Sequence, residues 1–343
     1  MLSFENDYSR TAHPAVVQAI ADAGEELYPG YGSDAACERA KSLIRSACGL
    51  PDDSPVWFLV GGTQTNQTVI DAITPAWAGV VAVESGHPNV HEAGAIEYSG
   101  HKVLTIPHHN GLMDPAELDA FCKTFYADGN YEHMVFPGCV YVSQASEYGT
   151  LYTKERLAAI AEVAHRYDMP LFVDGARLGY ALTATGNDLN LKDLASIADA
   201  FYIGGTKQGA LFGEAVVFPD PAKAPKHFLT QIKQHGALLA KGFLLGLQFE
   251  ALFTDDLYCS IARQANVAAD RIREALVAKG YELTFEAPTN QIFVTLDKPT
   301  IARLGEHVRL GFTEKFDETH DVMRICTSWA TTDREVDELI ALL

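Results

Sequence analysis

The sequence has little of several features that mark particular protein classes. Its six cysteines form no Cys-x-x-Cys pair and no metal-type spacing with histidine, which argues against a disulfide scaffold and a metal site. No apolar run approaches the roughly 20 residues that cross a bilayer, and the first residues lack the basic and apolar regions of a secretory signal. We therefore expect reduced, buried cysteines, no bound metal and a cytoplasmic location.

Basic residues are also scarce. The 343-residue chain has 26 Lys and Arg against 45 Asp and Glu, which gives a formal net charge of −19. An acidic surface repels nucleic-acid phosphates and anionic lipids, so we expect neither nucleic acid nor a membrane as a partner. With 48% hydrophobic and 21% charged residues, the composition is that of a globular protein with one large and one smaller domain.

The chain is organised around residues 171–209. Two apolar runs of strand length each deliver one ionisable group, Asp174 in the first and Lys207 after the second. Apolar residues at helical spacing in 190–198 fit the crossover of a strand–helix–strand unit. Such a unit puts the ends of both strands at the edge of a parallel sheet where ligands bind.

Asp174 and Lys207 suit a pyridoxal phosphate site. Desolvation favours the neutral amine of a buried lysine, the form that makes a Schiff base. The carboxylate is the natural partner for a pyridinium nitrogen. The plainer interpretation, a structural ion pair, stays open on spacing alone.

A strand followed by Gly-Gly-Thr and a helix, within residues 56–73, predicts an anion site. Backbone N–H groups and the positive end of the helix dipole would point at the anion, so Gly62 and Thr63 could hold a lone phosphate. The junction has neither the Gly-x-Gly-x-x-Gly nor the Walker spacing, so a nucleotide is less favoured. His87, at the exit of the next apolar run, could stack on a flat ring or move a proton, or be simply solvated.

The expected architecture is an α/β fold in which residues 14–245 form a large domain around a mostly parallel sheet. In the C-terminal part, short strands at 291–296 and 322–329 flank a helix, and a capping box opens a final helix. We expect residues 1–13 and 246–343 to form a small α+β domain, although the N-terminal segment looks too polar for a core strand.

Two cations stand among apolar residues. Arg324 alternates with apolar neighbours in its strand, so its guanidinium needs a bound anion or a carboxylate as partner. Lys241 lies in the apolar stretch 237–246, which a subunit interface would bury. The alternative is a lysine that extends to the surface from a buried helix. The first interpretation predicts an obligate dimer or tetramer.

Taken together, the motifs resemble the threonine aldolase family of fold-type-I pyridoxal phosphate enzymes. They occur in the family's order over essentially the whole chain: Gly-Gly-Thr-Gln-Thr-Asn at 61–66, Gly-His at 86–87 with Glu-Ala-Gly at 92–94, Val-Asp-Gly-Ala-Arg-Leu at 173–178, Thr-Lys at 206–207, and Arg324. The resemblance implies a lyase that cleaves a β-hydroxy-α-amino acid, such as L-threonine or L-allo-threonine, into glycine and an aldehyde.

The resemblance also implies roles for single residues. Lys207 would bind the cofactor as a Schiff base, Asp174 would pair with the ring nitrogen, and His87 would stack on the ring. The other implied contacts are Gly62 and Thr63 with the cofactor phosphate, Thr206 with the cofactor, Arg177 with the cofactor and the substrate carboxylate, Arg324 with that carboxylate, and Tyr31 and Lys241 with a neighbouring subunit's site in a homodimer or homotetramer.

Two positions depart from the family pattern. Where relatives have a serine that contacts the substrate, this chain offers at best Asn6. Where many have a histidine near the substrate hydroxyl, it has Glu147, which makes Glu147, His87 and an ordered water the candidate bases. Two other functions stay open: a β-eliminating lyase of the same fold, which would release ammonia and a keto acid, and a non-catalytic nucleotide-binding α/β protein.

Overall fold

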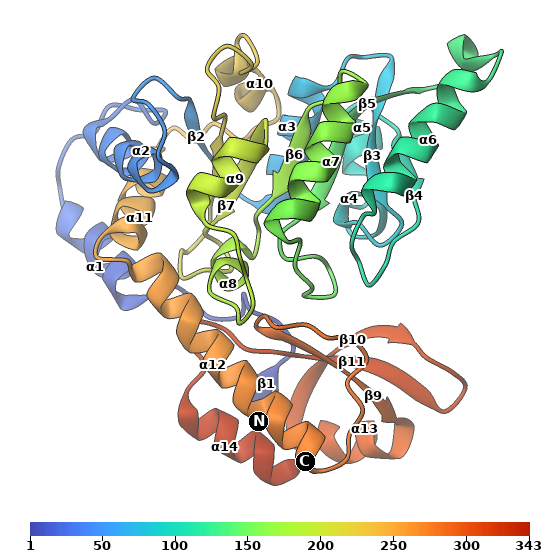
Figure 1. Cartoon of the computed structure of the whole chain (residues 1–343). Coiled ribbons are helices and arrows are strands. Elements are labelled where there is room, and N and C mark those ends of the chain that lie inside the picture. Colours follow the sequence, from blue (N-terminus) through green and yellow to red (C-terminus); the bar gives the residue numbers. More distant parts are fainter.

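The computed structural model describes all 343 residues, which form an upper part around a large sheet and a lower part around a small sheet (Figure 1). The large sheet has the strand order β2-β8-β7-β6-β5-β3-β4, and only β8 runs antiparallel to its neighbours. Its strands are β2 (Val56–Leu59), β3 (Ala78–Val83), β4 (Val103–Ile106), β5 (Phe136–Ser143), β6 (Leu171–Asp174), β7 (Ala200–Gly204) and β8 (Glu214–Val217). The expected mostly parallel sheet is confirmed.

Helices cover both faces of the large sheet. Alternate side chains of a strand point to opposite faces, so each face forms its own apolar core with the helices that cover it. Val81 and Val83 of β3 pack with one core, whereas Val80 and Ala82 pack with the other. The helices of the upper part are α1 (Pro14–Ala23), α2 (Ala35–Cys48), α3 (Gly62–Ile73), α4 (His87–Val90), α5 (Ala95–Tyr98), α6 (Pro115–Ala127), the short 3₁₀ helix Tyr131–His133, α7 (Lys154–Arg166), α8 (Leu178–Leu182), α9 (Leu191–Ile197), α10 (Phe228–Gln234) and α11 (Phe243–Phe253).

The predicted strand–helix–strand unit is present. The side chain of Asn190 accepts hydrogen bonds from the backbone of Lys192 and Asp193 and so caps α9, which connects β6 to β7. The two strands are parallel neighbours, with Phe172 paired to Ala200. Their carboxyl ends therefore lie side by side, as the sequence predicted for Asp174 and Lys207.

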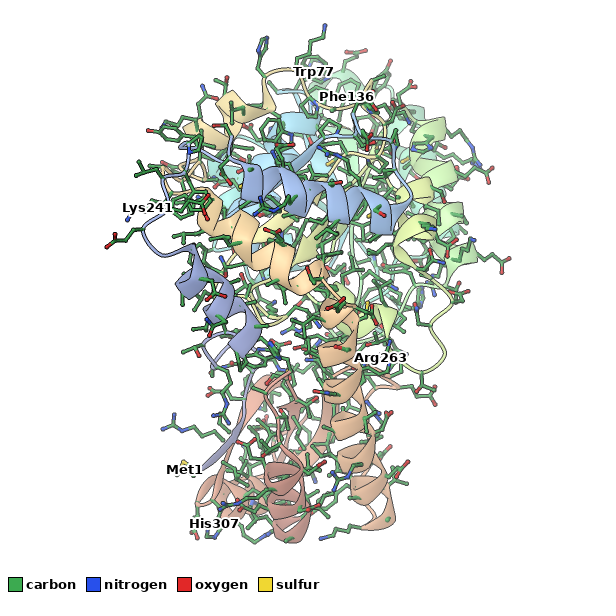
Figure 2. The ribbon with its side chains drawn as sticks, turned by 90° about the vertical axis from the view of Figure 1, so that its left-hand side faces the viewer. Met1, Trp77, Phe136, Lys241, Arg263 and His307 are labelled. Atoms are coloured by element: carbon green, nitrogen blue, oxygen red, sulfur yellow. The ribbon has the colours of Figure 1, made fainter.

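The small sheet has the strand order β1-β10-β11-β9 and carries its own apolar core. Its elements are β1 (Leu2–Phe4), α12 (Leu257–Ala278), β9 (Gln291–Asp297), α13 (Lys298–Gly305), β10 (Val308–Lys315), β11 (His320–Cys326) and α14 (Asp333–Leu342). Figure 2 shows Met1 and His307 together in this lower part, because β1 pairs in parallel with β10. None of the helices in the structure combines the length and apolar character that crossing a membrane requires.

The sequence analysis did not predict two strands of the small sheet, β1 and β10. The N-terminal segment looked too polar, yet Phe4 is buried and three residues suffice to pair with β10. β10 itself has only Val308 and Gly311 buried, so its composition carries no clear strand signal.

The junction between the two parts follows α11. The sequence places the boundary at residue 246, which lies inside α11, and this helix packs against α1 and α2 of the upper part. Asp255 and Asp256 both have positive φ angles and separate α11 from α12, the long helix that leads down to the small sheet (Figure 1). We propose that the domains meet at these two residues.

Candidate active site

A cavity of about 220 Å³ lies where β5, β6 and β7 end. It brings together eight of the predicted site residues: Gly62, Thr63, His87, Glu147, Asp174, Arg177, Thr206 and Lys207. The carboxyl edge of a mostly parallel sheet is where ligands of open α/β folds bind. Pockets for drug-sized ligands usually measure about 300–1,000 Å³, so this cavity suits a ligand with one small ring better than a dinucleotide.

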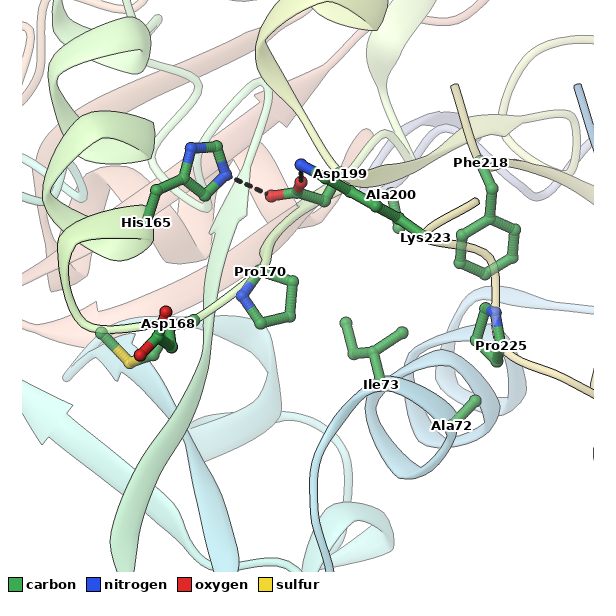
Figure 3. A pocket seen from close by; sticks show the side chains of 11 residues that line it. Ala72, Ile73, His165, Asp168, Pro170, Asp199, Ala200, Phe218, Lys223 and Pro225 are labelled. Carbon is green, nitrogen blue, oxygen red and sulfur yellow. Dashed lines mark hydrogen bonds and ion pairs between the residues drawn. The ribbon is translucent and has the colours of Figure 1, made fainter. Parts of the chain in front are cut away.

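A larger hollow of about 500 Å³ lies at the opposite edge of the sheet, but its charged groups neutralise one another. Figure 3 shows His165 and Lys223 converging on Asp199, with Asp199 Oδ2 2.6 Å from His165 Nε2 and Oδ1 2.8 Å from Lys223 Nζ. The backbone N–H of Leu171 also donates to Asp199. The amino ends of parallel strands seldom bind ligands. The enclosed cavity at the carboxyl edge is therefore the candidate site.

Asp174 ends β6 and is almost fully buried. Its Oδ1 accepts hydrogen bonds from Tyr202 Oη (2.5 Å) and the Ala176 N–H (2.9 Å), and its Oδ2 accepts from Tyr141 Oη (2.5 Å) and Asn66 Nδ2 (2.9 Å). Burial alone would raise the pKa of Asp174, but the charge of His87 and these donors hold the pKa below its ordinary value. The carboxylate is therefore ionised, as a partner of a protonated ring nitrogen must be. A ring N–H would take the place of one of the four donors.

Glycines bring the ends of β6 and β7 into contact. A Cβ on Gly175 would lie 1.9 Å from the carbonyl oxygen of Tyr202, and one on Gly204 would lie 2.5 Å from that of Ala176. These glycines therefore allow a close approach to the neighbouring backbone that no residue with a Cβ could make. The tight turn after Gly204 then places Thr206 and Lys207 on the cavity wall.

The helix α3 opens at the same cavity. It begins at Gly62, its N-cap Gly61 offers no side chain to the first N–H groups, and both Gly62 and Thr63 line the cavity. These free N–H groups and the helix dipole fit a phosphate.

His87 is held by a buried carboxylate. Its Nδ1 lies 2.5 Å from Oε1 of Glu92, and because a carboxylate only accepts hydrogen bonds, Nδ1 carries the proton and Nε2 is left for a ligand. Burial would lower the pKa of His87, but Glu92 and the negative charges of Glu147 and Asp174 raise it above the ordinary value. The amide of Asn66 donates to both Glu92 (2.7 Å) and Asp174 (2.9 Å), which joins the histidine to the central carboxylate.

Arg177 uses two of its three guanidinium nitrogens in a pair with another residue of the chain, Asp7. Its Nε donates to Asp7 Oδ2 (2.7 Å) and its Nη2 donates to Asp7 Oδ1 (3.1 Å), and both side chains are buried. Burial would raise the pKa of Asp7, but Arg177 and Lys207 lower it to about 2. Only Nη1 of Arg177 takes no part in this pair, so the residue can offer one nitrogen to a ligand.

Asn6 and Arg324 do not line the cavity. Asn6 Oδ1 accepts from the backbone of Tyr8 and the hydroxyl of Ser9. Arg324 Nη2 donates to the carbonyl of Glu5 (3.1 Å), and its buried Nε has no partner. The unpaired Nε leaves Arg324 with a hydrogen-bond donor for an anion.

Tyr31 and Lys241 lie on the surface of the upper part, away from the cavity of their own chain. Lys241 is labelled at its edge in Figure 2, and the N–H of Tyr31 donates to the carbonyl of Ala240 next to it. The apolar stretch 237–246 was expected to need a subunit interface. Within one chain, Ala237, Gly242, Leu245 and Gly246 of this stretch are buried, whereas Lys241 is exposed in the turn that precedes α11.

The sequence analysis assigned no role to four residues that line the cavity, Tyr8, Asn66, Tyr202 and Glu214, or to two that bond to its side chains from behind, Glu92 and Tyr141. The tyrosines carried a usable signal, because a tyrosine in a buried strand needs a partner for its hydroxyl. Glu214 carried another, since it is the one charged residue of an otherwise apolar strand.

Comparison with known proteins places the chain in a family. The model of the beta-eliminating lyase family matches residues 10–299. The chain is 29% identical to low specificity L-threonine aldolases of Pseudomonas aeruginosa, over 88% of this chain and 86% of that one, and of a Pseudomonas species, over 98% and 96%.

Solved structures agree. A threonine aldolase of Leishmania major superposes with a TM-score of 0.96 at 38% identity, covering 100% of this chain and 98% of that one. Aspartate aminotransferase of Thermus thermophilus has the same fold, with a TM-score of 0.73 at 16% identity over 100% and 90%. The fold is thus that of fold-type-I pyridoxal phosphate enzymes, and the chain belongs to the beta-eliminating lyase family, in its threonine aldolase branch.

Proposed function

We propose that this protein is a pyridoxal phosphate-dependent threonine aldolase that cleaves a β-hydroxy-α-amino acid into glycine and an aldehyde. One observation carries the proposal: an ionised Asp174, Lys207 and the uncapped start of α3 border the same cavity. When bound, pyridoxal phosphate supplies an electron sink for the pair of electrons released from the Cα–Cβ bond.

The residues around the cavity divide the remaining tasks. Lys207 would hold the cofactor covalently, and Asp174 would keep the ring nitrogen protonated. The N–H groups of Gly62 and Thr63 would bind the phosphate. The ring of His87 would lie against the cofactor ring, oriented by Glu92.

A direct test is the product assay. The purified protein should be yellow and should release acetaldehyde and glycine from L-threonine or L-allo-threonine. The match to the beta-eliminating lyase model keeps one alternative, a lyase that eliminates the β-substituent. Ammonia and a keto acid as the products would favour this alternative. A colourless protein that cannot take up the cofactor would contradict both.

Glu147 is the proposed base for the β-hydroxyl. It lines the cavity, and its carboxylate accepts no hydrogen bond within the chain, unlike the fully engaged Asp174. We expect Glu147→Gln to lower kcat by about 10²–10⁴-fold, the usual contribution of proton transfer, while KM changes little. Steady-state kinetics on L-threonine check this. Unchanged turnover would return the role to Nε2 of His87 or to water.

We further propose that the active site is shared between subunits. A protein of net charge −19 must hold a phosphate and a substrate carboxylate, yet Arg177 is paired with Asp7 and Lys207 is committed to the cofactor. Lys241 is exposed, and Lys233 lies 4.4 Å over the nearby ring of Tyr31, which makes this surface a source of cations. Lys241 of one subunit would help to bind the phosphate of another.

Mixed dimers test the sharing. Lys207→Ala and Lys241→Ala should each be impaired alone, but refolding them together should create some sites with both lysines and so restore part of the activity. Native mass spectrometry establishes that mixed dimers have formed. If their activity is only the sum of the two residual activities, each subunit works alone.

A further inference from the structure

Glu214 places a carboxyl group inside the sheet at the candidate active site. It opens β8, where it pairs with Gly204 of β7 on one side and Leu59 of β2 on the other, and it is only 2% exposed. Its Oε2 accepts the N–H of Gly205 (3.0 Å), and its Oε1 accepts the hydroxyl of Thr206 (2.8 Å). The side chain borders the same cavity as Lys207.

This carboxyl group lies at the proposed phosphate end of the cavity. Its hydrogen-bond partner Thr206 directly precedes Lys207, and its strand neighbour Leu59 is three residues from Gly62, at the start of α3. Thr206, Gly62 and Glu214 all line the cavity. A phosphate held by α3 would therefore meet a buried carboxyl. Two anions in a buried site repel one another strongly, because little water screens them.

The surrounding charges do not remove this conflict. Lys207 faces Glu214 from the loop after β7 and stabilises its charge, whereas Asp174 at the end of β6 opposes it. The other ionisable neighbours are Tyr202 of β7 and Tyr258 of α12, and β2 contributes none. Burial raises the pKa of Glu214 to about 8, although its two hydrogen bonds and Lys207 favour the ionised form.

We propose that the phosphate end of the cofactor binds only when Glu214 is protonated, so that binding to a site with an ionised Glu214 is coupled to the uptake of one proton. The proton comes from solvent and is bound by the carboxylate, and no bond of the phosphate changes. Glu214 is thus a positioning residue that holds Thr206 and Gly205 in either protonation state and admits the phosphate only when neutral. The inference rests on the proposed function, since it requires a phosphate-bearing cofactor.

The coupling predicts a defined pH dependence. Below about pH 8 free Glu214 is already protonated, so phosphate binding takes up no proton there. Above about pH 8 the free carboxyl is ionised and must be protonated on binding, so affinity should fall about tenfold per pH unit, with uptake of about one proton. A neutral amide at this position should remove the contribution of Glu214 to both effects.

The probe is pyridoxine 5′-phosphate, which has the ring and the phosphate but no aldehyde to react with Lys207. Calorimetry on the full-length protein freed of cofactor, in two buffers of different ionisation enthalpy, gives affinity and proton uptake together. At about pH 9, Glu214→Gln should bind about tenfold more tightly than the wild type and take up about one proton fewer. Any proton taken up by the ring nitrogen of the probe, which pairs with Asp174, is common to both proteins and cancels in this difference. Glu162→Gln, which changes an exposed carboxylate of α7, should behave as the wild type.

Two results would overturn the inference. One is pH-independent affinity without proton uptake in the wild type, a measurement that does not depend on any variant folding. The other is a Glu214→Gln protein with the same pH dependence as the wild type. Failure of the probe to bind at every pH would instead contradict the proposed function, and the inference with it.

Discussion

Lys207→Ala protein should be colourless and should lose essentially all activity. Lys207 stands in the turn after β7 and lines the cavity, and no other lysine does so. Without it the cofactor has no covalent attachment, and the loss of proton transfer by this amine would alone cost about 10²–10⁴-fold. Visible absorbance of the purified protein and initial rates with L-threonine measure the effect.

Borohydride reduction identifies the attachment site. In the wild type, reduction should fix the cofactor on the peptide that contains Lys207, and the variant should not be labelled. Lys123→Ala is the matched control, because its amine is 69% exposed on α6 and pairs only with Asp119. Normal labelling of the Lys207→Ala protein at another lysine would show that the assignment is wrong.

Asp174→Asn should leave the protein folded but lower kcat by about 10⁴-fold, by analogy with the loss of other buried orienting carboxylates. An amide has no negative charge to keep the ring nitrogen protonated. In the wild type, Tyr141, Tyr202 and Asn66 donate hydrogen bonds to the two carboxylate oxygens of Asp174. The amide replaces one of these oxygens by an NH₂ group, which cannot accept a hydrogen bond. Steady-state kinetics measure the loss, and circular dichroism reports whether the fold persists.

Asp199→Asn is the control for a structural effect. Asp199 is also a carboxylate that accepts several hydrogen bonds (Figure 3), and its side chain is only 9% exposed, but it precedes β7 at the opposite edge of the same sheet. Its loss should lower thermal stability with kcat nearly unchanged. If Asp174→Asn likewise lowers kcat by less than about tenfold, or about 1.4 kcal/mol, the charge of Asp174 has no special role in the reaction.

The central unit could be predicted because its signals are local. Apolar runs, glycines and the Asn190 cap specify β6, α9 and β7, and the parallel pairing then brings Asp174 and Lys207 to one edge. The Asp34 cap that begins α2 is equally local, since its side chain accepts from the N–H of Cys37. Short-range patterns thus locate the site.

The partners of those residues could not be predicted, since they come from elsewhere in the chain. Tyr141 and Asn66 contact Asp174 only because β5 neighbours β6 and α3 starts at the same edge. Glu214 belongs to the antiparallel strand β8, whose place between β2 and β7 follows from tertiary pairing. The pairing of Arg177 with Asp7 joins residues 170 positions apart, a distance that no periodicity reveals.

The Asp7–Arg177 pair also bears on the order in which the protein folds. Asp7 follows β1, and β1 is anchored by the pairing of Leu2 with Val308 near the other end of the chain. Contacts of such long sequence separation form late, because they close a large loop. The large sheet can form from local units, but Arg177, which follows β6 and precedes α8, is paired with Asp7 only once the N-terminal strand has joined the small sheet. A nascent chain that ends before β10 therefore has a sheet without a finished active site.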